Sequence, residues 1–462
     1  MSRHSFADRR KSSEPYLPYW SHVSNGVVLL EDGSRLAMAK LHGLPHELCP
    51  AEHRNVSAEL LNRIYRDIGN DNITICIHLV RDRADNYVSA PRFRNDFSRQ
   101  FHRAYHEHVI TGKLYQNDWY LTLIVSPRGI PIGTKNFRRK MATSFYQFRS
   151  IKDRKYADTS EIETVWMQLE RSLSSYSVQR LGYRYNTTPY HRYRFSEIGE
   201  ALKLFLGVKG AVPVTTGRLG NDIYTDSDQP IFENRIFRIL PPGCDDDGDD
   251  ADGVRWGSLF ALQNYMEETG PDLFDALLSL EMPLVVSQYF SFSAKPDAVA
   301  HLTRTRRQMA AAKDAATKQR KGLKKAASKA QEGEEARGEH DLTIAIYADT
   351  YRDGLRNSAI ARAALVNTGA QLVQETGGNL AAYFGQLPGN FPLVTHPGKL
   401  GSRDFVNFAN FGAFPRGALY GKWGPAMLRF ATTALTGYDF VPHVGDVGMA
   451  AIPTSPTCGT KS

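Results

Sequence analysis

The chain has 462 residues, more than one ordinary hydrophobic core supports, so we expect two or three domains. Its 42% hydrophobic and 23% charged residues are typical of a globular protein, and its net charge of +8 is modest for this length. No run reaches the roughly 18 apolar residues that a membrane-spanning helix needs. The four cysteines form no C-x-x-C pair, which argues against a zinc ribbon or a disulfide framework and fits a reducing compartment.

Strand and helix patterns alternate through the first part of the chain. Two apolar runs flank Asp32-Gly33, whose tolerance of positive φ predicts a hairpin with a type I′ turn. Ser57 precedes apolar residues at helical spacing, which predicts a helix capped by this serine. Residues 73–79 alternate as a strand does, and aromatic residues at every fourth position of 93–105 predict an aromatic-faced helix. We therefore expect an α+β fold with mixed, mainly antiparallel sheets and flanking helices.

A stretch rich in Ala, Lys, Arg and Gln follows in the second half of the chain. Because alanine buries little surface, we expect a long, exposed, basic helix or helical hairpin over about residues 296–338. Between Arg304 and Lys329 ten basic residues accompany one acid, Asp314. Two interpretations stay open: the segment binds nucleic-acid phosphates, or it is a solvated helix face that can meet an acidic partner. It lacks aromatic residues that would stack on bases, so nucleic-acid binding is the weaker hypothesis.

Other residue clusters give no clear chemical signal. His102 and His106 lie four positions apart and would share a helix face, but the H-E-x-x-H order of a metalloprotease is missing, so we expect no metal site. The six aspartates within residues 245–252 lack the order of a calcium loop, and we interpret them as a solvated insertion. No G-x-S-x-G elbow supports a hydrolase triad, and we expect no catalytic residue in this chain.

The final third of the chain carries an ordered set of short motifs. Residues 385–390 read GQLPGN, residues 405–411 read FVNFANF, and residues 421–448 read GKWGPAMLRFATTALTGYDFVPHVGDVG. This order resembles the CagE/TrbE/VirB family of type IV secretion and conjugation ATPases, where an LPGN segment, a Trp-Gly, a Thr-bearing strand and an H-x-x-D-x-G hairpin precede the phosphate-binding loop. The matching residues are Leu387, Pro388, Gly389, Asn390, Trp423, Gly424, Thr432, His443, Asp446 and Gly448.

The resemblance covers almost the whole chain, because Leu17-Pro18-Tyr19 and Gly43-Leu44 are similar to the opening of that family. It implies a cytoplasmic protein, peripheral to the inner membrane, that meets other type IV secretion subunits and forms homo-oligomers. Intact family members bind and hydrolyse ATP with Mg²⁺ to drive pilus assembly and substrate transfer, and their N-terminal part mediates docking and oligomerisation. The alternative hypothesis is a DNA-binding accessory protein of a mobile element that uses the basic stretch.

The same resemblance implies a division into three domains. We expect an N-terminal α+β domain at residues 1–155 and a central CagE/TrbE/VirB-type domain at 156–400. Residues 401–462 would form an incomplete lead-in to a RecA-like ATPase domain.

The family's phosphate-binding loop would fall at residues 455–462, SPTCGTKS. Lys461 and Ser462 match the lysine and the hydroxyl that contact phosphate and Mg²⁺ in such a loop. Ser455, Cys458 and Thr460 stand where glycines would let the backbone wrap the phosphates. We therefore expect a degenerate remnant in a chain truncated at this loop, with no bound ATP or Mg²⁺ and no ATP hydrolysis by this chain alone.

Overall fold

The computed structural model of the chain describes residues 16–45, 50–84, 95–110, 112, 114–127, 158–187, 192–223, 230–240, 253–265, 275–311, 317–366, 370–426, 428–442 and 447. The chain divides into two compact units: a larger one of residues 1–81 and 118–413, and a smaller one of residues 82–117 and 414–462. Among the described residues, no helix combines the length and the apolar character that crossing a bilayer requires. The expected domain boundaries at 155 and 400 stay predictions.

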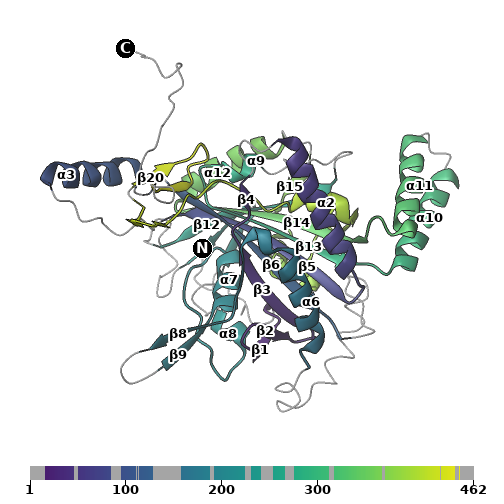
Figure 1. The fold of residues 1–462 in the computed structure, drawn as a ribbon. Helices are drawn as coiled ribbons and strands as arrows, with labels where there is room; N and C mark the ends of the chain where they lie inside the picture. The colour runs from purple at the N-terminus through teal and green to yellow at the C-terminus, as the bar shows by residue number, and fades with distance from the viewer. Residues whose placement is uncertain are drawn as a thin grey trace, which may run out of the picture. The chain divides into compact units, whose positions relative to one another are not determined.

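The larger unit is built around one sheet, which has thirteen strands among the described residues (Figure 1). Its strands are β1 (Tyr19–Ser24), β2 (Val27–Leu30), β3 (Arg35–Leu41), β5 (Ile73–Arg83), β6 (Tyr115–Val125), β7 (Val178–Arg180), β10 (Pro230–Glu233), β11 (Ile236–Ile239), β12 (Arg255–Asn264), β13 (Leu284–Phe292), β14 (Arg337–Ala348), β15 (Gln371–Gln374) and β16 (Gly398–Gly401). Their order is β1-β2-β3-β6-β5-β13-β14-β12-β11-β10, while β15 pairs with β12, β16 with β14 and β7 with β3. The pairs β5–β13, β13–β14 and β12–β14 are antiparallel.

Helices accompany this sheet, so the predicted α+β fold with a mainly antiparallel sheet is confirmed. They are α2 (Ala51–Ile68), α6 (Ser160–Ser172), α7 (Glu197–Phe205), α8 (Leu219–Ile223), α9 (Asp275–Leu278), α10 (Lys295–Ala311), α11 (Thr317–Glu332), α12 (Tyr351–Val366), α13 (Asn379–Gly385) and α14 (Ser402–Phe408), with short 3-10 turns η3 (Ser174–Tyr176) and η4 (Phe391–Leu393). Two small strand pairs complete the unit: β4 (Leu44–Pro45) with β17 (Gly412–Ala413), and β8 (Tyr183–Thr187) with β9 (Arg192–Ser196).

The central strands of the sheet are buried on both faces. Cys76 and Val80 of β5 belong to the same hydrophobic core as residues of α7, α8 and α13. Side chains alternate across a strand, so Ile75 and Ile77, which are also buried, point to the opposite face. A strand covered on both faces needs an almost continuous apolar run, and β5 accordingly begins ITICIHLV. The strand predicted at residues 73–79 is confirmed.

The smaller unit contains one helix, a π-helical turn and two hairpins among its described residues. These are α3 (Asp96–Tyr105), η2 (His106–Ile110), β18 (Tyr420–Gly421) with β19 (Gly424–Pro425), and β20 (Leu428–Ala431) with β21 (Gly437–Phe440). The Asn95 side chain caps α3, because its Oδ1 accepts a hydrogen bond from the Ser98 N–H at 2.8 Å. The predicted aromatic-faced helix is therefore confirmed over residues 96–105, and Phe93 lies outside the described residues.

The basic stretch forms two helices, α10 and α11, which pack on each other and stand away from the sheet (Figure 1). We refer to α10 and α11 together as the basic hairpin. Gly333 adopts a φ of 76° directly after α11, in the left-handed region that ends many helices. The helical part therefore ends at Glu332, and β14 begins at Arg337, just inside the expected limit of 338.

Two local predictions differ from the structure. The hairpin at Asp32-Gly33 joins β2 to β3, but only Gly33 has a positive φ, 85°, so the turn is not type I′. Asp32 instead accepts the Ser34 N–H through Oδ1 at 2.9 Å. Ser57 does not cap a helix, because α2 begins at Ala51 and the Ser57 hydroxyl bonds within it. The first turns of α2 are largely exposed and polar, so hydrophobic spacing did not reveal them.

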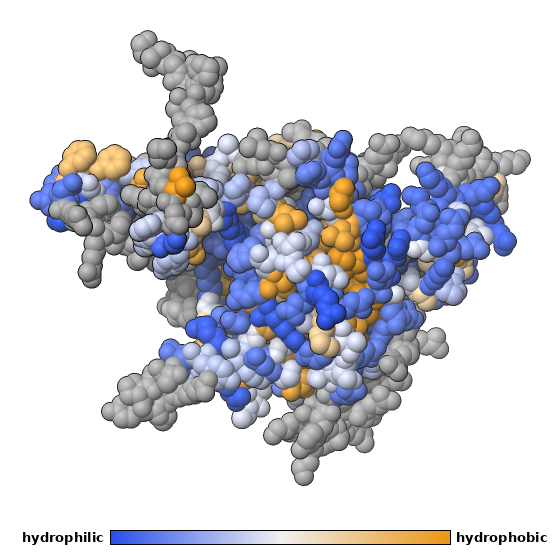
Figure 2. Space-filling view, viewed as in Figure 1, coloured by the Kyte–Doolittle hydropathy of each residue, from blue (hydrophilic) through white to orange (hydrophobic). Residues whose placement is uncertain are grey.

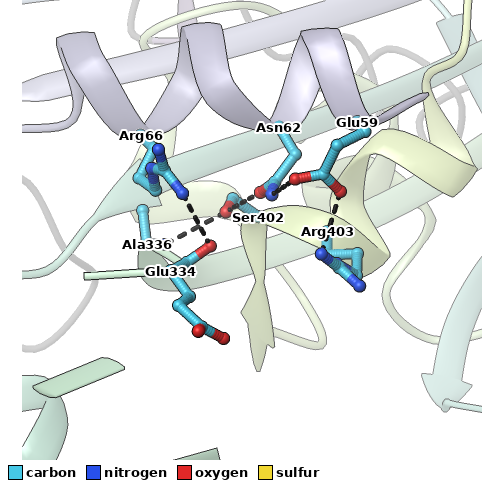
Figure 3. A network of polar contacts seen from close by, with 7 residues as sticks. All are labelled: Glu59, Asn62, Arg66, Glu334, Ala336, Ser402 and Arg403. Atoms are coloured by element: carbon cyan, nitrogen blue, oxygen red, sulfur yellow. Dashed lines mark hydrogen bonds and ion pairs between the residues drawn. The ribbon is translucent and has the colours of Figure 1, made fainter. Parts of the chain in front are cut away.

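A polar network joins α2 to α14 and to the segment that leads into β14 (Figure 3). The Ser402 hydroxyl donates to Asn62 Oδ1 at 2.6 Å and accepts from the Ala336 N–H at 3.1 Å. Ser402 and Asn62 are both fully buried, so these bonds satisfy groups that water does not reach. Three further contacts complete the network: Asn62 Nδ2 to Glu59 Oε1 at 3.4 Å, Arg403 Nη2 to Glu59 Oε2 at 2.8 Å, and Arg66 Nη1 to the Glu334 carbonyl at 3.3 Å.

Replacing the serine of this network tests whether it stabilises the larger unit. Ser402→Ala leaves the Asn62 carbonyl and the Ala336 N–H without this partner, so we expect a loss of about 1–3 kcal/mol in the free energy of unfolding. Urea denaturation measures the loss. The matched control is Ser172→Ala on the exposed end of α6, which should change stability by less than about 0.5 kcal/mol. Equal effects of the two substitutions would contradict the assignment.

Candidate functional site

The sequence motifs divide between described and undescribed parts of the chain. Lys461 and Ser462, the predicted remnant of a phosphate-binding loop, lie outside the described residues, as do His443, Asp446 and Gly448. The LPGN loop, Leu387 to Asn390, lies in the larger unit. Trp423, Gly424 and Thr432 lie in the smaller unit.

The LPGN loop is bonded to the start of the chain's first described strand. The Tyr19 hydroxyl donates to the Pro388 carbonyl at 2.7 Å, and this contact is buried. The Asn390 side-chain amide donates to the Tyr16 carbonyl at 2.8 Å and to the Phe384 carbonyl at 2.9 Å. The loop thus joins the start of the described chain, including β1, to the end of α13 through buried and partly buried groups.

Gly389 occupies a position in this loop where a side chain would be strained. Its φ of 89° lies in the region that side chains disfavour. A Cβ built there would lie 2.6 Å from Leu30 Cδ1, well inside van der Waals contact. The glycine is therefore required by the packing of the loop on β2, which gives this part of the family motif a structural role.

A buried histidine lies under the loop. His78 of β5 donates from Nε2 to the Gln386 carbonyl at 2.8 Å and stacks on the Phe205 ring, with centroids 3.9 Å apart. Its Nδ1 has no hydrogen-bond partner among the described residues. Burial lowers the pKa of His78 to about 4, and the bond to Gln386 opposes this only partly. The cavity beside it measures about 10 Å³, room for one water molecule rather than a ligand.

The motif residues of the smaller unit lie in two hairpins. Trp423 is in the turn between β18 and β19, with 67% of its surface exposed. The motif predicts that Thr432 lies in a strand, but β20 ends at Ala431 and Thr432 lies in the turn that follows. There its hydroxyl contacts the Thr436 hydroxyl at 2.7 Å. A turn suits threonine because its side chain can bond locally. Within the second hairpin, Arg429 binds Asp439 through two contacts of 2.7 and 2.9 Å.

The helix α3 carries an exposed aromatic row. Phe97 and Phe101 are 78% and 57% exposed, and their rings stack with each other and with Tyr105 at centroid distances of 6.5 and 6.4 Å. Figure 2 shows the resulting apolar patch on α3. The two histidines considered as metal ligands lie in different elements. His102 is buried on α3, whereas His106 is the first residue of η2. No group of three metal-binding side chains gathers among the described residues.

The basic hairpin presents a strongly charged surface in the larger unit. Figure 2 shows it as mostly hydrophilic. Arg304 and Arg307 of α10 and Lys324 and Lys325 of α11 are exposed, and none of them bonds to a described carboxylate. Sequence inspection identified the basic run, but it could not tell whether nearby acids neutralise these cations.

A cavity of about 360 Å³ opens where the basic hairpin leaves the sheet. It lies between the C-terminal end of α2, the start of α10 and the segment after α11. Its charged lining residues are Arg66, Asp71, Lys295, Glu335 and Arg337. The carboxylates nearly balance the cations, and Arg337 already pairs with Glu335 at 3.2 Å, so the lining favours no particular class of ligand. Sequence reasoning did not find this cavity, because its walls come from segments far apart in the chain.

Comparison with known proteins identifies two family matches. Residues 26–131 match the family model described as type IV secretion system ATPase VirB4/TrbE, N-terminal domain. Residues 186–395 match the model described as CagE, TrbE, VirB family, component of type IV transporter system. The second match includes residues 385–390, GQLPGN, so it covers the LPGN loop that bonds to Tyr16 and Tyr19.

Individual relatives give the same result over nearly the whole chain. The chain is 38% identical over 445 residues to protein virB4 of Rhizobium radiobacter, which is 96% of this chain and 54% of that protein. It is 28% identical over 450 residues to type IV secretion system protein virB4 of Bartonella quintana, covering 96% and 55%. It is 23% identical over 447 residues to PtlC of Bordetella pertussis, covering 95% and 52%. The chain spans about half the length of the curated relatives it matches.

Substituting a glycine of the LPGN loop tests its structural role. Gly389→Ala forces a side chain into a positive-φ position and against Leu30, so we expect a loss of about 2–4 kcal/mol in unfolding free energy. The control is Gly322→Ala in α11, which meets no atom within 4 Å and should gain about 0.5–1 kcal/mol. Chemical denaturation of both variants checks the opposite signs. A Gly389→Ala protein as stable as the wild type would refute the role.

Acidification should destabilise the protein through its buried histidines. Burial lowers the pKa of His78 to about 4 and of His340 to about 3, from an ordinary value of 6.5. The unfolded chain therefore binds protons first, and stability falls as the pH drops from about 6.5 toward 4, by up to about 1.4 kcal/mol per pH unit for each histidine. Burial raises the pKa of Asp341 to about 6 and also raises the pKa of Asp32 and Glu335, so these carboxyls oppose the trend.

The variant His78→Gln isolates one of these contributions. Glutamine keeps an N–H donor for the Gln386 carbonyl but has no proton to gain, so the slope of stability against pH should become shallower below pH 6.5. Urea midpoints of the wild type and the variant, compared at several pH values, provide the measurement. Parallel curves would show that His78 contributes nothing to the pH dependence.

Proposed function

The chain belongs to the CagE/TrbE/VirB family of type IV secretion proteins, and on this premise we propose that it is a docking and assembly subunit of such a system. It would act in the cytoplasm at the inner membrane, with other secretion subunits and further copies of itself as partners. The observation that supports this proposal is the match over 96% of the chain to protein virB4 of Rhizobium radiobacter, in which the two family-model matches keep the expected order.

The large two-faced sheet fits a scaffold role. Its core is closed by the LPGN loop, and the cavity beside that loop has room for about one water molecule. The surfaces open to partners lie elsewhere, on the basic hairpin in the larger unit and on the aromatic row of α3 in the smaller unit. Such an arrangement offers contact surfaces on two exposed helical features of the described chain.

ATP hydrolysis with Mg²⁺ is the proposed activity of intact relatives, and we propose that this chain does not perform it alone. Lys461 and Ser462 are the two residues that fit a phosphate-binding loop. Cys458 and Thr460 carry side chains where the loop needs glycine, and these would keep the backbone N–H groups from the phosphates. Residues 401–462 would then serve as a lead-in to a RecA-like domain rather than as a nucleotide site.

A DNA-binding accessory role is the second candidate, and the unpaired cations of the basic hairpin favour it. Phosphate contacts by lysine and arginine bind nucleic acid without regard to sequence and weaken steeply with salt. The absence of aromatic residues from both helices limits this binding to the phosphate backbone.

Co-purification distinguishes the two functions. The tagged chain, expressed in cells that carry a type IV secretion system, should retain inner-membrane secretion subunits after nuclease treatment. The same protein should show no steep decrease of duplex DNA retention with increasing salt. Loss of all secretion subunits on nuclease treatment, together with such a salt dependence, would replace the docking function with the DNA-binding one.

A further inference from the structure

We propose that the basic hairpin is a contact surface for the anionic phospholipid headgroups of a membrane leaflet. The inference rests on the proposed function, because a subunit that works at a membrane meets such a surface. It goes beyond that function by assigning the lipid contact to α10 and α11 rather than to the sheet or to the smaller unit.

The cations of the hairpin are free to bind an external anion. Its described basic side chains beyond the first turn are Arg304, Arg306 and Arg307 on α10 and Lys324, Lys325 and Lys329 on α11. Five of these side chains, all except Lys329, take part in no ion pair or hydrogen bond within the described part of the chain, whereas the charge of Lys329 acts on the Glu335 carboxyl and opposes the rise in its pKa. Elsewhere in the larger unit arginines are paired at short distances, as Arg180 is with Glu163 at 2.7 Å.

The two helices use their small and apolar residues to pack on each other. Ala298 and Leu302 of α10 and Ala330 of α11 are buried, whereas Lys324 and Lys325 are exposed. On α11 the small residues Ala326 and Ala330 lie four positions apart and share one face. The basic residues therefore occupy the outward faces, over helices of 17 and 16 residues, which corresponds to about 25 Å of length.

The two acids of the described helices lie at the ends nearest the sheet. Asp297 is in the first turn of α10, and Glu332 is the last residue of α11. Glu332 is already engaged, because its Oε1 accepts a hydrogen bond from the Ser328 hydroxyl at 2.7 Å. The part of the hairpin farther from the sheet is thus basic on both of its described helices.

Diffuse negative charge is the partner that this surface fits best. Among the described residues, neither helix exposes a large apolar side chain, so the hairpin suits adsorption onto headgroups rather than insertion among acyl chains. Neither described helix has a Phe, Tyr or Trp to stack on bases. Clusters of four to eight lysines and arginines on a helix beside a membrane are a recognised feature of binding to anionic lipids.

Vesicle sedimentation with charge-neutralised variants tests the inference. The full chain is mixed with phosphatidylcholine vesicles that either lack phosphatidylglycerol or contain about one-third of it. Only the anionic vesicles should bind the wild type, and added salt should release it. The hairpin variant carries Arg304→Gln, Arg307→Gln, Lys324→Gln and Lys325→Gln, and its affinity should fall about ten-fold or more.

Two further variants separate the position of the charge from its amount. The matched control removes four exposed cations from α12 and β16 through Arg352→Gln, Arg356→Gln, Arg362→Gln and Lys399→Gln, so it lowers the net charge equally and should keep its binding. Lys324→Arg with Lys325→Arg retains the charge and should also bind. Unchanged urea midpoints would show that the hairpin variant is folded.

Three results would overturn the inference. The wild type could bind neutral and anionic vesicles equally, or the hairpin variant and the α12 control could lose vesicle affinity equally. The third result is a wild type that retains duplex DNA but not anionic vesicles. None of them affects co-purification with secretion subunits, so the proposed function is judged separately. Loss of those subunits with lipid binding intact would instead reject the docking function.

Discussion

Covering both faces of one large sheet is the constraint that shapes the larger unit. Strands β5, β13 and β14 lie in its middle, and their side chains have no face open to water. Polar residues on these strands must therefore find partners inside the protein. His78 donates to the Gln386 carbonyl, and the Gln288 amide donates to the Phe408 carbonyl at 2.8 Å. The residues after α13 and within α14 thus supply hydrogen-bond acceptors for these buried side chains of the sheet.

The LPGN loop helps to meet this requirement for buried hydrogen-bond partners. The LPGN loop provides the carbonyl that Tyr19 binds, and the residue just before the loop provides the carbonyl that His78 binds. The side-chain amide of Asn390 donates to two further main-chain carbonyls. Its glycine allows the loop to lie directly on Leu30. A motif that resemblance associates with the approach to a nucleotide site therefore acts here as an internal brace of the scaffold.

Much of the fold could be predicted from the sequence where a single element leaves a periodic trace. Residues 73–79 alternate apolar and less apolar side chains, and residues 97–105 place aromatics four apart, so both elements were identified. The start of α2 was missed because its first turns are exposed and carry no apolar period. The turn at Asp32-Gly33 is not of the predicted type because an aspartate that tolerates positive φ can instead accept a hydrogen bond from the N–H two residues on, here that of Ser34.

The candidate site was less predictable, because its important properties depend on distance in space. Whether Lys324 has a carboxylate beside it, or whether His78 has a partner for Nδ1, depends on segments hundreds of residues away. The sheet order itself places β5 next to β13, and no local pattern specifies that pairing. The residue types that carry the basic hairpin were visible in the sequence, whereas their freedom from ion pairing was not.

The order of strands in the sheet also affects how the protein is made. Thr74 of β5 bonds to Ser291 of β13 across 217 residues, and Tyr19 bonds to Pro388 across 369. At roughly 5–20 residues per second, a ribosome needs about 10–45 s after making the first of these strands before its neighbour emerges. During that time β5 has an unpaired, strongly apolar edge, the kind of surface that chaperones hold. Synthesis speed and chaperone supply would thus limit the yield of folded protein.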